Sequence, residues 1–278
     1  MSKRLNPQDI LDKKARGQKI TMLTAYDFPL ASFIDQCGID MVLVGDSLAN
    51  VVLGLESTRE VTMEIMLHHA KAVNRGVKHA LLVGDMPYDA FQSGLKHAVF
   101  CAKRFVKEAG CDAVKLEWFD GCLKMAEAIV KSGIPVMGHV GLTPQTVDKI
   151  GGFKVQGKDA QGAIKIMAQA KSLAEKGCFS LVLECIPDRI AKLVTSSLAI
   201  PTIGIGAGAH CDGQVLVTHD LLGLFERFRP KFAKQYVDLG QAIRKGVKQF
   251  RSDVSAKKFP AKAHSFSITV EELAKIKI

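Results

Sequence analysis

Eight short apolar segments rich in β-branched residues recur along the chain, and most are separated by segments with helical spacing. The expected strands are residues 19–27, 40–47, 79–87, 112–118, 135–142, 180–186, 201–208 and 214–220. The clearest helical segments, each ending on glycine as helices commonly do, are 61–76, 89–110, 122–133 and 159–177. This alternation predicts a parallel sheet with helical crossovers. Repeated eight times in 278 residues, it predicts a closed (β/α)8 (TIM) barrel over an open doubly wound sheet.

Composition and the position of the charges indicate the domain organisation. With 47% hydrophobic and 24% charged residues, the chain can bury one large core, expected over residues 18–225. Residues 227–278 carry +9 of the net charge of +10, from thirteen Lys or Arg and four Asp or Glu. We therefore expect residues 226–278 to be a basic helical extension, with helices at 233–250 and 269–278, of a single barrel domain spanning 1–278.

Several partner classes are not expected. No recognised nucleic-acid-binding module accompanies the basic residues, so we predict no nucleic-acid partner. No apolar run approaches the roughly 18 residues of a membrane span and residues 1–18 lack a signal peptide, which predicts a cytoplasmic protein without a membrane partner. The seven cysteines are scattered and never spaced as CxxC, which argues against a disulfide framework and a thiolate zinc site.

Two neighbouring expected strands end in the same Gly-Asp pair. MVLVGDS contains Asp46 and Ser47, and ALLVGD ends in Asp85. A single Asp at the end of a strand is most simply a helix N-cap. Two matching carboxylates, with Glu117 nearby on the next strand, instead favour one hard cation at the C-terminal ends of the strands, where barrel active sites lie. Oxygen ligands without a His or Cys cluster favour magnesium over zinc.

Further polar residues end the later strands. Lys115 and Glu117 are two residues apart and so lie on the same side of a strand. A buried Lys needs an anionic partner, which is either Glu117 in a structural pair or a substrate carboxylate. His139 is either a satisfied core histidine or a site residue. Glu184, at the end of an apolar run, is a candidate general base.

Two other features have simpler explanations. Cys185, beside Glu184, has no His placed to activate it, so we interpret it as structural. The glycine-rich turn over residues 204–214 departs from the spacing of a phosphate loop and only loosely follows that of a dinucleotide fingerprint. Close backbone packing at the barrel mouth is the explanation we adopt.

The motifs resemble those of the ketopantoate hydroxymethyltransferase family. From about residue 19 to residue 220, the segments that carry the resemblance are, in order, TAYDFPLA, VGDSLANVVLG, GDMPY, VKLEW, GHVGLTPQ, GGFKVQGK, LVLECIP and IGIGAGAHCDGQVLVTHD. The later FPAKAHSF resembles the family's usual ending, and residues after Phe266 extend beyond it. The resemblance implies a barrel of the phosphoenolpyruvate/pyruvate type, a magnesium ion and a homodecamer. It also implies transfer of a hydroxymethyl group from 5,10-methylenetetrahydrofolate to 3-methyl-2-oxobutanoate, in pantothenate biosynthesis.

The resemblance also implies roles for the site residues. Asp46 and Asp85 would bind the metal with Glu117 beside them. The residues that would contact the oxo acid are Asp46, Ser47, Asp85 and Lys115. Glu184 would be the proton acceptor, and His139 would support it.

Two alternatives use the same sequence features. A magnesium-dependent carbon-carbon lyase of the same barrel superfamily would act on a 2-oxo acid without folate. A non-enzymatic binding protein, anchored by the basic extension, would bind an anionic polymer without turnover.

Overall fold

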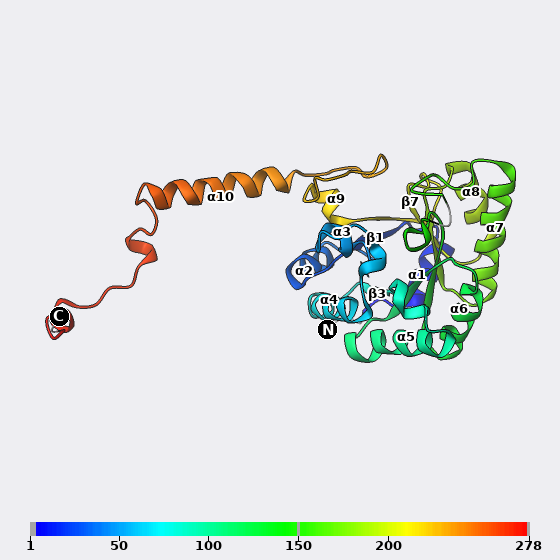
Figure 1. Ribbon diagram of the computed structural model, residues 1–278, viewed down its shortest axis with the longest axis horizontal. Coiled ribbons are helices and arrows are strands. Elements are labelled where there is room, and N and C mark those ends of the chain that lie inside the picture. The colour runs from blue at the N-terminus through cyan, green and yellow to red at the C-terminus, as the bar shows by residue number, and fades with distance from the viewer. Residues whose placement is uncertain (1–3, 149–150, 277–278) are drawn as a thin grey trace.

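The computed structural model describes residues 4–148 and 151–276, in which eight parallel strands close into a barrel (Figure 1). The strands are β1 (Ile20–Thr24), β2 (Met41–Val44), β3 (Leu81–Asp85), β4 (Ala113–Glu117), β5 (Val136–Gly141), β6 (Ser180–Glu184), β7 (Thr202–Ile205) and β8 (Gly213–Leu216). Each strand pairs with the next along the chain, and β8 pairs with β1. The predicted closed parallel barrel is therefore confirmed.

Helices surround this barrel (Figure 1). They are α2 (Phe28–Gln36), α3 (Leu48–Val51), α4 (Met63–Gly76), α5 (Leu95–Ala109), α6 (Cys122–Lys131), α7 (Ala160–Glu175), α8 (Asp188–Ser197) and α9 (Thr218–Leu222). Short 3-10 turns lie at η1 (Thr58–Glu60), η2 (Tyr88–Phe91) and η3 (Pro144–Thr146). The expected helix over 89–110 divides into η2 and α5 at Gly94, whose φ of 86° is a left-handed conformation that favours glycine. No helix in the described part of the chain is long and apolar enough to cross a bilayer.

Several expected boundaries are wrong. The eighth strand ends at Leu216, because Thr218 hydrogen-bonds through both its backbone and its hydroxyl to Thr24 and starts α9. Residues 206–212 join β7 to β8 without a helix. In the extension, α10 (Leu239–Ser255) begins later than expected, at the N-cap Asp238. Within the described residues, the expected helix over 269–278 is limited to α11 (Val270–Leu273), and residues 277–278 lie outside the described part of the chain.

The barrel interior is apolar where the strands begin and polar where they end. Side chains alternate across a strand, so Ala113, Lys115 and Glu117 of β4 share one face. Ala113 belongs to the apolar cluster inside the barrel. At this end the helix α1 (Pro7–Ala15) inserts the fully buried Ile10 into the same cluster. Lys115 and Glu117 therefore lie at the C-terminal end of β4, beyond this apolar cluster.

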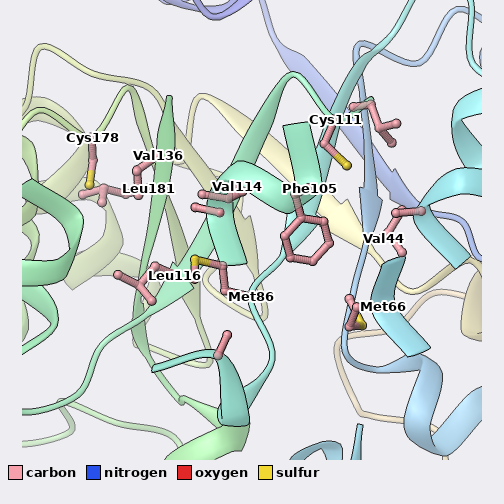
Figure 2. Close-up of a cluster of buried hydrophobic side chains, with 14 of the residues drawn as sticks. Val44, Met66, Met86, Phe105, Cys111, Val114, Leu116, Val136, Cys178 and Leu181 are labelled. Atoms are coloured by element: carbon pink, nitrogen blue, oxygen red, sulfur yellow. The ribbon is translucent and has the colours of Figure 1, made fainter. Parts of the chain in front are cut away.

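A second apolar layer lies between the strands and the surrounding helices. Figure 2 shows part of it, with Phe105 of α5 beside Val114 and Met86. Gly84 of β3 faces this layer, and a Cβ atom at Gly84 would overlap the Phe105 ring. The glycine of this Gly-Asp ending is therefore required by packing, while Asp85 faces the interior.

The C-terminal extension runs away from the barrel (Figure 1). No residue of α10 is buried. Its exposed apolar residues, each between 46% and 62% exposed, are Ile243, Val247, Phe250 and Val254. Their spacing places them on one face of the helix.

We predict that Gly84→Ala lowers the free energy of unfolding by about 1–3 kcal/mol, because the added methyl overpacks against Phe105. Urea unfolding measures the change. The matched test is a double-mutant cycle with Phe105→Leu, in which the smaller side chain should relieve part of the cost. Additive effects of the two substitutions would contradict the packing explanation.

Candidate active site

Strand register brings the predicted polar residues together at the C-terminal end of the barrel. Asp85 of β3 pairs with Lys115 of β4, and Glu117 pairs with His139 of β5. Together with Asp46, which follows β2, these side chains are buried, with at most 5% of each residue's surface exposed. Buried charges of this kind require partners of opposite charge. The contacts among them therefore determine what the site can do.

Lys115 lies among the carboxylates. Its Nζ is 2.9 Å from Asp85 Oδ1 and 3.9 Å from Glu117 Oε1. Asp85 is thus its nearer partner in the protein, although the sequence suggested Glu117 or a substrate carboxylate. Burial lowers the pKa of Lys115, but Asp85 and Glu117 outweigh burial and raise it above its ordinary value. Lys115 is therefore a protonated cation.

His139 bridges two acidic residues. Its Nδ1 lies 3.4 Å from Glu117 Oε1, and its Nε2 lies 3.2 Å from Glu184 Oε2. Burial and the charge of Lys115 lower the pKa of His139, but the contacts with Glu117 and Glu184 raise it to about 9. The imidazole is consequently protonated at neutral pH and lies within ion-pair distance of both Glu117 and Glu184. A merely satisfied core histidine would not connect two acidic groups in this way.

The three central carboxylates differ in their pKa. Burial, followed by the charges of Asp85 and Glu117, raises the pKa of Asp46 well above its usual value. Burial also raises the pKa of Asp85 despite the opposing charge of Lys115. Burial raises the pKa of Glu117 too, but its contacts with His139 and Lys115 bring it below its usual value. Ionisation is thus disfavoured at Asp46 and Asp85, mainly by burial.

The N-cap explanation does not apply to the two Gly-Asp endings. The N-cap of α3 is Ser47, and that of η2 is Pro87. By contrast, Asp27, which also follows a strand, caps α2 by accepting a hydrogen bond from the Leu30 backbone. Asp46 and Asp85 therefore remain candidate site residues, while Asp27 caps a helix.

The other two sequence features are structural as expected. Burial, and secondarily the charge of Glu184, raises the pKa of the Cys185 thiol to about 12, which disfavours a nucleophilic thiolate at neutral pH. In the glycine-rich turn, a Cβ at Gly213 would lie 2.5 Å from the Ile20 carbonyl oxygen. Because this turn leads directly into β8, it presents no helix N-terminus to a phosphate.

Two polar residues of the site were not identified from the sequence. Gln145 is fully buried and hydrogen-bonds to Asp46 and, through its backbone, to Glu117. The Tyr26 hydroxyl lies 2.9 Å from Ser47 Oγ. Gln145 is the last residue of the motif GHVGLTPQ, and Tyr26 lies in the motif TAYDFPLA. The signal that could have identified them is a polar side chain shortly after the end of a strand.

The carboxylate oxygens at this site fit a hard cation that takes its remaining ligands from water and substrate. Asp85 Oδ1 is buried, and its partner among the described residues is Lys115 Nζ, at 2.9 Å. Over residues 4–148 and 151–276, no group of three or more His, Cys, Asp or Glu side chains is arranged to hold a metal ion. Mg²⁺ usually keeps several waters and binds one or two carboxylates together with substrate oxygens. Asp46 and Asp85 fit such a partial ligand set.

Fold and site together define a parallel (β/α)8 barrel with a buried acidic centre at the ends of its strands. Solved structures share this fold, including 2,3-dimethylmalate lyase, with a TM-score of 0.60 and 13% identity over 97% of this chain and 93% of that one. Phosphonopyruvate hydrolase, solved in complex with oxalate and Mg²⁺, has a TM-score of 0.57 and 13% identity over 98% of this chain and 94% of that one. At this identity, the similarity establishes the fold alone.

Sequence relatives are far more similar. A family model described as ketopantoate hydroxymethyltransferase matches residues 4–262. The 3-methyl-2-oxobutanoate hydroxymethyltransferase of Clostridium botulinum (strain 657 / Type Ba4) is 53% identical over 263 residues, which are 95% of this chain and 96% of that protein. The protein of the same name from Desulfotalea psychrophila is 54% identical over 93% of each chain. This chain belongs to the ketopantoate hydroxymethyltransferase family.

We predict that Lys115→Met lowers the free energy of unfolding by about 3–5 kcal/mol in metal-free buffer, because it leaves buried carboxylates without their cation. Urea unfolding measures the loss. The control is Lys131→Met, which removes an ion pair with Glu127 from a lysine side chain that is 73% exposed, and should change stability by less than about 1 kcal/mol. Equal effects of the two substitutions would show that Lys115 does not balance the buried charge.

Proposed function

We propose that this chain transfers a hydroxymethyl group from 5,10-methylenetetrahydrofolate to 3-methyl-2-oxobutanoate, forming ketopantoate for pantothenate biosynthesis. The observation that carries the proposal is the contact between His139 and Glu184, 3.2 Å apart, beside the buried Asp46, Asp85 and Lys115 in a chain of this family. The reaction requires removal of a weakly acidic proton from C3 of the oxo acid. A base beside a cation site supplies what that step needs.

Asp46 and Asp85 would hold Mg²⁺, with Glu117 beside them. When bound, Mg²⁺ would supply Lewis-acid stabilisation of negative charge on the keto oxygen of the substrate. The two carboxylates reach this position from adjacent strands, and the pKa of each is raised mainly by burial. A nearby cation would favour their ionised forms. Their burial also limits competition from bulk water.

Lys115 and Ser47 would bind the oxo acid. Lys115 lies 2.9 Å from Asp85 Oδ1 and is the cation nearest to the proposed metal ligands. A charge-assisted contact to the substrate carboxylate would orient C3. Ser47, held by the Tyr26 hydroxyl at 2.9 Å, would contribute a hydroxyl donor. Asp46 and Asp85 complete the proposed substrate contacts.

Glu184 would remove the C3 proton. Its side chain is 16% exposed, whereas those of His139 and Glu117 are 2% exposed, so Glu184 is more accessible to a substrate. His139 would fix the orientation of the Glu184 carboxylate through their contact at 3.2 Å. Glu117 would in turn hold His139 from the opposite side, at 3.4 Å.

The same site chemistry also suits the lyase alternative, which differs by acting without folate. We favour the transferase because relatives at 53–54% identity carry that name, whereas the lyase is similar at only 13% identity. The proposed ligands are small metabolites. We accordingly propose a cytoplasmic enzyme without nucleic-acid or membrane partners.

We further propose that residues 226–278 are an extension of the barrel domain through which copies of the chain assemble into a homodecamer. The apolar face of α10 supports this, since Val247 is 62% and Phe250 is 58% exposed. A second copy of the chain would cover that face. Burial of these side chains would contribute about 25 cal/mol for each Å² removed from water.

The direct test of function uses purified protein, Mg²⁺ and both substrates, with ketopantoate detected by mass. Without folate, in deuterated water, the wild type should exchange the C3 proton of 3-methyl-2-oxobutanoate faster than the protein-free control, as followed by NMR. Glu184→Gln keeps its shape but loses its basicity, so it should neither exchange the proton nor form product, although calorimetry should still detect substrate binding.

The matched control is Glu175→Gln, an exposed residue of α7 outside the site, which should behave like wild type. Wild-type exchange by Glu184→Gln would move the base elsewhere, with His139 as the next candidate. Cleavage of a 2-oxo acid without folate, and no ketopantoate with it, would favour the lyase.

We predict that Val247→Asp and Phe250→Asp reduce the molecular mass of the assembly, because a charge on the apolar face of α10 would be costly to bury. Size-exclusion chromatography with light scattering measures the mass. Ser252→Asp, on the opposite face of the same helix, should leave it unchanged. A monomeric wild type, or unchanged mass in both apolar-face variants, would refute a role for this face.

A further inference from the structure

The amide of Gln145 connects parts of the site that come from three strands. Gln145 belongs to η3, after β5, and is fully buried. Its Nε2 donates to Asp46 Oδ2 at 2.9 Å and to the Met86 carbonyl oxygen at 3.0 Å. Its backbone N–H donates to Glu117 Oε2 at 3.0 Å. One residue thus holds the loops after β2 and β3 and the end of β4.

The orientation of this amide follows from its partners. Asp46 Oδ2 and the Met86 carbonyl are both acceptors, so the amide atom that faces them is the NH₂ group. The remaining Gln145 Oε1 is buried and has no hydrogen-bond partner among the described residues. A buried polar atom without a partner is costly. Stability alone therefore does not explain why a glutamine occupies position 145.

We infer that Gln145 is a positioning residue for the cation site, an inference that rests on the proposed function. It binds Asp46 through Oδ2 and so leaves Oδ1 as the oxygen available to Mg²⁺. It binds Glu117 through Oε2 and so leaves Oε1 beside His139, 3.4 Å away. One residue thereby orients both the proposed metal ligand and the acid that holds His139.

The amide also fixes the orientation of the Asp46 carboxylate. Gln145 Nε2 donates to Asp46 Oδ2 at 2.9 Å, so the carboxylate cannot rotate freely. Without that donor, Asp46 would lose this fixed orientation. Groups that hold a metal ligand in this way typically change metal affinity by about 10-fold to 100-fold when removed.

The test replaces the amide and titrates the protein with Mg²⁺ alone in a calorimeter. Gln145→Met keeps the approximate size and removes the donor, while Gln145→Glu keeps the shape and turns the donor into an acceptor. Both should raise the Kd for Mg²⁺ by at least about 10-fold. In turnover, the Mg²⁺ requirement should rise more than KM for the folate. Gln169→Met, a substitution of another buried glutamine on α7, should leave both constants unchanged.

Folded Gln145→Met that binds Mg²⁺ with the wild-type Kd would overturn the inference but leave the proposed function intact. A wild type that binds no Mg²⁺ would overturn the proposed metal site and this inference together. Unfolding of both Gln145 variants but not of Gln169→Met, as measured by circular dichroism, would assign Gln145 a purely structural role and overturn the inference.

Discussion

The attraction between Lys115 and the carboxylates buried around it is the interaction on which the site depends. Each buried charge loses hydration worth several kcal/mol, and the loss is tolerable only where partners lie close. Lys115 Nζ lies 2.9 Å from Asp85 Oδ1, and His139 lies between Glu117 and Glu184. Two cations and the Gln145 amide thus allow four acidic groups to share a small volume.

The barrel supplies the rigidity that this arrangement needs. Parallel pairing sets Asp85 beside Lys115 and Glu117 beside His139, so the side chains cannot move apart without breaking the sheet. Below them, apolar residues and the inserted Ile10 exclude water from the barrel interior. Electrostatic effects are stronger where water is excluded, which suits the proposed removal of a weakly acidic proton.

Much of this architecture was predictable because barrel strands have a local signature. The strand positions and the inward direction shared by Lys115 and Glu117 follow from the two-residue repeat. Other features depend on distant contacts and were not predictable. The end of β8 is set by Thr218, which bonds to Thr24, 194 residues away. The start of α10 depends on an N-cap at Asp238 that helical periodicity alone does not identify.

By itself the sequence determined the closed barrel, the acidic strand ends and the resemblance to one enzyme family, since these depend on local periodicity and on residue types in order. Only the tertiary structure decided how the site residues are connected. It paired Lys115 more closely with Asp85 than with Glu117, and it placed Gln145 against Asp46, 99 residues away. The physical reason is that such contacts depend on the register between strands and on side-chain orientations, which local spacing does not encode.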